Sequence, residues 1–181
     1  MKRIDLLISF LTLASVASGQ GFYKGENGTM RFFSSAPLED IEAESRKVTS
    51  ALNAATGEVA VLISINSFVF DKSLMQEHFN ENYLESDKYP AASFTGKIPG
   101  HLSLNTGETR SVKVSGNLTI HNVTMARDIQ VTLEMNSDGS LSASGNFKVN
   151  LEDHKVKIPQ LLFQNIAEEV EVSFELKLKR S

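Results

Sequence analysis

The sequence contains no cysteine and no tryptophan, and these absences exclude several kinds of site. Without cysteine the chain has no disulfide, no thiolate nucleophile and no zinc–cysteine centre. With only three tyrosines, it has few of the residues that form the two aromatic girdles of an outer-membrane β-barrel. The last residues, Lys179-Arg180-Ser181, also lack the aromatic side chain expected at the end of such a barrel.

Basic clusters and long apolar runs are missing as well. The formal net charge is −4 over 181 residues, which does not favour binding to nucleic acid. No apolar stretch is long enough to cross a membrane as a helix. A chain of this length is expected to form one domain whose core needs no disulfides.

The first residues have the pattern of a signal peptide. Lys2 and Arg3 form a charged start, residues 6–13 form a short apolar stretch, and Ala17-Ser18-Gly19 supplies small residues at the cleavage spacing. The sequence therefore predicts a signal peptide over 1–19 and one domain over 20–181. Export follows from this prediction, and no cysteine is present to carry a lipid anchor.

Most of the remaining chain alternates apolar with polar residues, which is typical of antiparallel strands with one dry face. The turns between them carry glycine next to small polar residues, at Thr56-Gly57, Asn105-Thr106-Gly107 and Ser137-Asp138-Gly139. Repeated antiparallel hairpins predict a β-sandwich or a closed barrel. The clearest alternating sets lie in 59–65, 112–120, 129–135, 141–151 and 170–178.

One region fits two interpretations. Leu38, Ile41, Ser45, Val48 and Leu52 recur at helical spacing after Pro37, which favours a helix over 38–53. The alternative is a strand over 43–53 that pairs across the Thr56-Gly57 turn.

The segment 70–94 interrupts the strand pattern with a short amphipathic helix. Leu74, Met75, His78, Phe79 and Tyr83 recur at helical spacing and are expected to share one face. Asp71 and Ser73 are N-cap candidates, Ser73 with Gln76 matches a capping box, and Pro90 prevents continuation. Such a helix needs an apolar surface, here a sheet face or a barrel mouth, and would expose Glu77, Glu81 and Glu85.

The histidines give little support to a metal site. His78 with Glu77 and Glu81 on one helix is one interpretation, and a solvated helix edge is the simpler one. His121, beside Asn122, is expected to be a hydrogen-bonding turn residue. His154 follows Asp153, and neighbouring strand residues point to opposite faces, so no dyad is expected there.

Catalysis is not indicated either. The chain has no G-x-S-x-G elbow and no Gly-rich phosphate loop. An enzyme acting on a hydrophobic substrate inside a barrel would need titratable groups on the luminal face, and the candidates His121, Arg127 and Asp153 are scattered. We therefore assign no catalytic residue, no metal ligand and no cofactor.

Several stretches together resemble the YceI-like family. They lie at 30–59, 67–98, 114–124 and 158–166, in the family's order, and the most specific is LMQEHFNENYLESDKYPAASF. The resemblance implies an exported, periplasmic protein that forms an eight-stranded antiparallel lipocalin-like barrel with one short amphipathic helix. It also implies a strand at 43–53. The chain departs from the family at Asn122, where Gly is frequent, and 125–128 is a residue or two longer than the usual join.

The resemblance further implies that the lumen holds an apolar, lipid-like chain, since some members bind polyisoprenoids. The pattern alone favours a filled core over a lined cavity, whereas the resemblance favours the cavity. The partners expected are this small molecule and, transiently, a membrane, but no nucleic acid. The role would be carriage, storage or stress protection; an outer-membrane barrel and an enzyme remain the alternatives. The predicted ligand-binding residues are Phe68, Phe70, Met75, Phe79, Phe94, Leu118, Ile120, Phe147, Phe163 and Phe174.

Overall fold

The computed structural model describes residues 21–35, 40–157 and 167–181. The predicted signal peptide over 1–19 and the predicted ligand-binding residue Phe163 lie outside the described residues.

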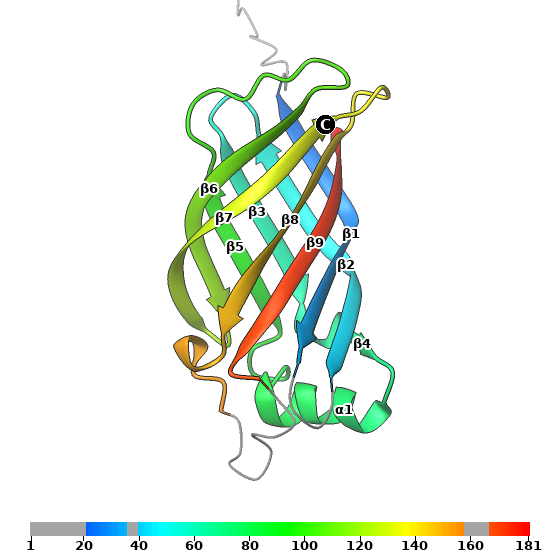
Figure 1. The fold of residues 1–181 in the computed structure, drawn as a ribbon, viewed down its shortest axis with the longest axis vertical. Helices are drawn as coiled ribbons and strands as arrows, with labels where there is room; N and C mark the ends of the chain where they lie inside the picture. Colours follow the sequence, from blue (N-terminus) through cyan, green and yellow to red (C-terminus); the bar gives the residue numbers. More distant parts are fainter. Residues whose placement is uncertain (1–20, 36–39, 158–166) are drawn as a thin grey trace, which may run out of the picture.

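Within the described residues, eight long antiparallel strands form a closed barrel (Figure 1). β1 pairs with both β2 and β9, and this double pairing closes the sheet on itself. The predicted eight-stranded antiparallel barrel is thereby confirmed. The strands are β1 (Phe22–Ser34), β2 (Ile41–Asn53), β3 (Glu58–Ser64), β5 (Ala91–Lys97), β6 (Thr109–Ile120), β7 (Val123–Met135), β8 (Leu141–Asn150) and β9 (Glu169–Arg180).

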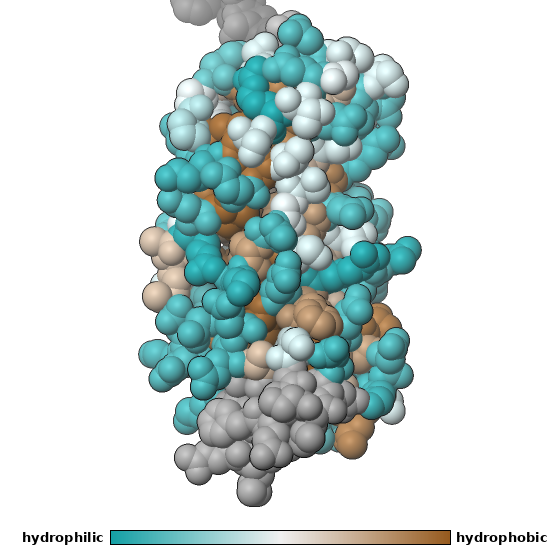
Figure 2. Space-filling model, in the orientation of Figure 1, coloured by the Kyte–Doolittle hydropathy of each residue, from teal (hydrophilic) through white to brown (hydrophobic). Residues whose placement is uncertain are grey.

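The alternation of apolar and polar residues forms the two faces of the barrel wall. The inward residues make one large buried apolar cluster, in which Val48 and Leu141 are fully buried. The outward residues include cross-strand ion pairs such as Lys113–Asp128 and Lys148–Glu169. On the face drawn in Figure 2, hydrophilic side chains cover most of the wall, with apolar residues showing between them.

The region with two interpretations is a strand, as the family resemblance implied. Gly28 and Met30 of β1 are two residues apart, but their partners Val48 and Ser45 on β2 are three apart. This β-bulge places Arg46 and Lys47 together on the outside. Because the bulge shifts the alternation by one residue, Ser45, Val48 and Leu52 are all buried at a spacing that imitates a helix.

The chain between β3 and β5 covers one end of the barrel (Figure 1). After the 3-10 helix η1 (Ile65–Ser67), the short strand β4 (Val69–Phe70) pairs with β2 at Ala43 and Glu44. Helix α1 (Ser73–His78) and the π-helical turn η2 (Phe79–Tyr83) follow directly. Together they form the predicted short helix of 11 residues.

Two details of that helix differ from the sequence-based expectation. The N-cap is Lys72, without a side-chain cap, so neither Asp71 nor Ser73 caps the helix. Leu74 does not share the covered face and is 59% exposed. Met75, Phe79 and Tyr83, which are spaced four residues apart, face the barrel interior, and Leu74 does not.

The β6–β7 hairpin closes in two residues. His121 and Asn122 both have left-handed backbone (φ 51° and 58°), as a type I′ turn requires, so Asn122 serves where glycine is frequent in the family. The pairing then continues without a register shift to Thr109 and Glu134. Residues 125–128, which are longer than the usual join of the family, therefore lie within β7. The expected turn at Asn105–Gly107 instead ends a longer connection, residues 98–108.

Phenylalanine rings inside the barrel lie against glycines of the wall. Gly96 and Gly116 face each other on β5 and β6, and a Cβ on Gly116 would lie 2.8 Å from the Phe94 ring and 2.3 Å from the Thr95 carbonyl oxygen. Gly145 is in a similar position against the ring of Phe174. The glycines thus make room for the rings at the wall, and less of each ring enters the lumen.

We expect Gly116→Ala to lower the free energy of unfolding by about 3 kcal/mol, because the backbone oxygen of Thr95 cannot yield to a new Cβ. Gly107→Ala is the control. Gly107 has φ +79° and open space around it, so alanine there adds only backbone strain of about 1 kcal/mol. Urea denaturation measures both; equal losses would contradict the role assigned to the glycine pair.

Candidate functional site

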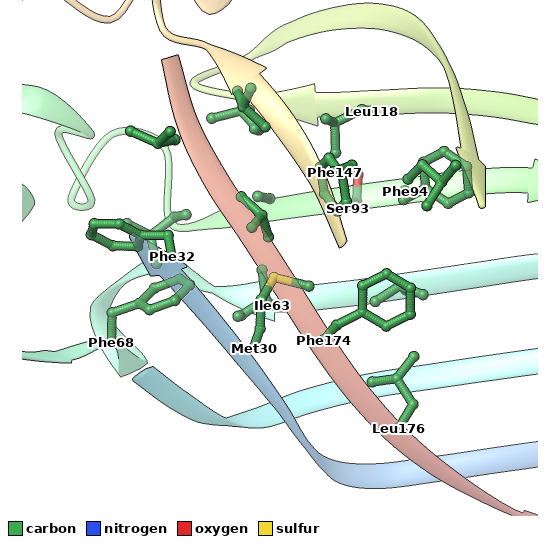
Figure 3. Close-up of a pocket in the computed structure, with 18 of the residues that line it drawn as sticks. Met30, Phe32, Ile63, Phe68, Ser93, Phe94, Leu118, Phe147, Phe174 and Leu176 are labelled. Atoms are coloured by element: carbon green, nitrogen blue, oxygen red, sulfur yellow. The ribbon is translucent and has the colours of Figure 1, made fainter. Parts of the chain in front are cut away.

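The barrel encloses a cavity of about 300 Å³. All eight long strands contribute side chains to its wall, and α1 and η2 add Met75, His78, Phe79 and Tyr83 at the helix end. Figure 3 shows phenylalanine, leucine, isoleucine and methionine side chains surrounding this space. No Lys, Arg, Asp or Glu among the described residues lines it. The lumen is therefore an apolar cavity and not a fully packed core.

The predicted ligand-binding residues gather around this one space. Every one that the structure describes lines the cavity: Phe68, Phe70, Met75, Phe79, Phe94, Leu118, Ile120, Phe147 and Phe174. Their contact with a ligand stays a prediction. The predicted set did not include Met30 and Phe32 of β1, which line the same cavity; their spacing of two residues on either side of Arg31 was the available signal, and the apolar Phe33 obscured it.

Four phenylalanines fix the helical segment to the barrel mouth. The Phe32 ring is centred 5.5 Å from Phe68, 5.6 Å from Phe70 and 5.4 Å from Phe79. Phe79 also contacts Phe68 at 5.7 Å and Phe70 at 5.0 Å. Phe79 contacts all three of the other rings and is therefore a central contact between the helix and the barrel end, beside Met75 and Tyr83, which also pack against the core.

A second, polar connection ties the helical segment to the β6–β7 hairpin. His121 Nε2 lies 3.0 Å from Glu85 Oε2, and the His121 ring meets Tyr89 edge-on at 4.4 Å. Lys88 donates a further hydrogen bond to Glu85. Glu85 was expected on the solvent side of the helix; it lies after the helix, is partly exposed, and is held by Lys88 and His121. His121 is a hydrogen-bonding turn residue, as expected.

The pKa of Glu85 is lowered by these neighbours, first by the hydrogen bond from Lys88 and then by that from His121. Both partners stabilise the ionised carboxylate. Tyr83, at the same end of the barrel, has its pKa raised by burial, so its hydroxyl stays neutral at the cavity wall.

His154 contacts the start of β7, in a part of that strand that does not pair with β8. These strands share four residue pairs, from Thr132 to Met135 on β7. At the first residue of β7, outside these pairs, His154 Nδ1 lies 3.1 Å from the Val123 carbonyl oxygen. His154 belongs to the 3-10 helix η3 (Glu152–His154), not to a strand; it is buried and lines the cavity, while Asp153 is exposed.

The candidate groups for catalysis or metal binding do not converge. His121, Arg127 and Asp153 are absent from the described cavity wall. In the described ranges, no three His, Asp or Glu side chains are placed to hold a metal ion. Nor does this part of the chain contain a helix long and apolar enough to cross a membrane.

The model of the YceI-like domain matches residues 20–178. No curated protein matches the chain.

Solved structures share the fold at low sequence identity. A polyisoprenoid binding domain from Saccharophagus degradans, described as implicated in plant cell wall breakdown, is 19% identical with a TM-score of 0.76, over 89% of this chain and 99% of its own. BcnA from Burkholderia cenocepacia is 18% identical with a TM-score of 0.69, over 83% and 95%. The YceI protein of Campylobacter jejuni is 16% identical with a TM-score of 0.61, over 80% and 88%.

We expect Phe79→Ala to release the helical segment from the barrel, because it removes all three ring contacts of Phe79. The loss of unfolding free energy should be about 3 kcal/mol, with faster amide hydrogen exchange in residues 73–84. Leu74→Ala, on the exposed side of the same helix, should change stability by about 0.5 kcal/mol or less. Unchanged exchange in Phe79→Ala would show that other contacts hold the segment.

The lowered pKa of Glu85 gives a pH-dependent prediction. Its stabilising effect is fully present above the ordinary carboxyl pKa of 4.5 and is lost as the pH falls through the lower folded-state value. Glu85→Gln should therefore lower the melting temperature at about pH 7 and leave it unchanged at about pH 2. Glu81→Gln, which alters an exposed carboxylate of the same segment, is the matched control; an equal effect of both variants would refute the ion pair's contribution.

Proposed function

The chain belongs to the YceI-like family, and from this premise we propose that it is an exported binding protein that holds a lipid-like, isoprenoid-type ligand in the barrel lumen. The observation that carries the proposal is the apolar cavity of about 300 Å³ without a charged residue in its described wall. The cavity lies at the small end of the range for small-molecule sites, and its lining suits a hydrocarbon chain.

The energetics of such binding come from burial. Each 100 Å² of apolar ligand surface removed from water contributes about 2.5 kcal/mol before ordering costs. A closed barrel is already ordered before the ligand enters, so little protein ordering offsets this gain. No chemical step is needed, and carriage, storage and stress protection all share this one binding step.

The ligand class is supported by a structural neighbour. The Saccharophagus degradans protein with the same fold is described as a polyisoprenoid binding domain. At 19% identity this likeness supports the fold, and the apolar wall of the present cavity supports the extension of the ligand class to this chain. The residues proposed to contact the ligand are the nine cavity-lining residues named above, together with Phe163.

The helix end is the proposed entrance. Phe33, Val69 and Leu74, at the end of β1, in β4 and in α1, are large apolar side chains that remain exposed. Exposed apolar side chains at a lipid-binding site favour transient contact with a membrane surface. The signal-peptide pattern in 1–19 and the family support a periplasmic location.

The two alternatives fit the described residues less well. An outer-membrane barrel turns an apolar band outward, whereas this barrel carries ion pairs such as Lys148–Glu169 and Lys177–Asp138 on its outer wall. An enzyme would need titratable groups that converge on the lumen, and the three candidates do not line it.

A larger side chain introduced on β5 fills part of the cavity and thereby tests the proposal. Ala92 is buried and lines the cavity, whereas its neighbour Ala91 is exposed on the outer face. We expect lipid-free wild-type protein and Ala91→Phe to take up farnesol, and Ala92→Phe to bind it at least ~10-fold more weakly, a loss of about 1.4 kcal/mol. Native mass spectrometry and calorimetry measure this binding, and organic extraction of the purified protein identifies any native lipid.

An empty extract together with no farnesol uptake by wild type would overturn the carrier function. Equal binding by Ala91→Phe and Ala92→Phe would place the site outside the barrel lumen.

A further inference from the structure

His154 is a polar side chain in a wall that is otherwise nearly all apolar. Its residue is 3% exposed and lines the cavity. The ring is held on one side by Val123, whose carbonyl oxygen lies 3.1 Å from Nδ1. The His154 backbone is held as well, because its carbonyl oxygen accepts from His121 Nδ1 at 3.3 Å.

The Val123 contact fixes how the two ring nitrogens are used. A carbonyl oxygen only accepts hydrogen bonds, so Nδ1 carries the proton in this contact. In the neutral ring, Nε2 is then an acceptor. No described residue donates a hydrogen bond to Nε2. Nε2 is not one of the fully buried polar atoms without a partner, which among the described residues are Ser50 Oγ and Asn80 Oδ1. This nitrogen therefore keeps open space beside it in a residue that lines the cavity, and a donor on a bound ligand can hydrogen-bond to it there.

The surroundings restrict what kind of polar group fits. No Lys or Arg of the described chain lines the cavity, and neither 36–39 nor 158–166 contains a Lys or Arg. A phosphate placed among these side chains would leave its charge uncompensated, which is far more costly than burying a hydroxyl that has a partner. The cavity thus favours a neutral polar group over an anionic one.

We propose that His154 Nε2 accepts a hydrogen bond from the polar end of the ligand. The ligand class is then an apolar chain that ends in a neutral donor, a hydroxyl or an amide N–H, and not in a diphosphate. This inference rests on the proposed function, because it names the chemistry of a ligand in the same cavity.

The test compares three probes on lipid-free protein: farnesol, farnesyl methyl ether and farnesyl diphosphate. The ether keeps the chain and loses the donor. Wild type should bind farnesol roughly 5- to 30-fold more tightly than the ether, as expected for one hydrogen bond to His154 Nε2 away from bulk water. It should also bind farnesol more tightly than the diphosphate. Calorimetry gives the three affinities.

His154→Asn separates the two ring nitrogens. The asparagine Nδ2 group replaces Nδ1 as donor to Val123, but no atom of the side chain reaches the position of Nε2. The variant should bind farnesol and the ether with equal affinity. Asp153→Asn introduces the same residue at the exposed neighbouring position and should keep the wild-type preference.

If His154→Asn does not fold, a measurement on the wild-type protein tests the same contact. The ¹⁵N resonance of His154 Nε2 should shift when farnesol is added and stay unchanged with the ether, because only farnesol donates to this nitrogen.

The role of His154 and the carrier function predict different results in these measurements. Equal wild-type affinities for farnesol and the ether, a preference that persists in His154→Asn, or tightest binding of the diphosphate would each overturn the role of His154 while leaving a lipid carrier. Binding of none of the three probes would overturn the carrier function itself.

Discussion

The closure of the sheet between β1 and β2 is the constraint on which the other features of this protein depend. β1 pairs with β9 on one side and with β2 on the other, so the ring of long strands has an inside and an outside. Because side chains alternate along each strand, closure collects the apolar residues in one lumen and leaves the ion pairs outside. The helical segment then has an apolar rim to cover, and the cavity exists only because the ring is complete.

Phenylalanine and glycine together determine how much of that lumen stays open. The rings of Phe94 and Phe174 lie against Gly96, Gly116 and Gly145, where a larger wall residue would push them inward. A chain with eleven phenylalanines can therefore keep a cavity. The sequence pattern favoured a filled core because a strand pattern shows which face a ring is on, but not whether a glycine on the next strand makes room for it.

Particular residues show how far the sequence could predict the structure. The alternation located the strands, and a short helix was correctly expected within 70–94, where it spans 73–83. The segment 43–53 needed family knowledge, because the bulge at Arg46 and Lys47 hides the alternation. Leu74 was assigned to the wrong face, since so short a helix is oriented by the rings it meets and not by its own periodicity. His154 was taken for a strand residue, and its place in the cavity wall had no signal in the sequence.

The sequence by itself determined the strand alternation, the existence and position of the short helix and the membership of a family, because these depend on neighbours a few residues apart. Only the tertiary structure decided the size of the cavity and the connection of Glu85, His121 and His154. Glu85 lies 36 residues before His121, and His154 lies 33 residues after it. Their contacts require the closed barrel, which brings the end of the helical segment, a two-residue hairpin and η3 to the same end of the lumen. No local pattern carries that information.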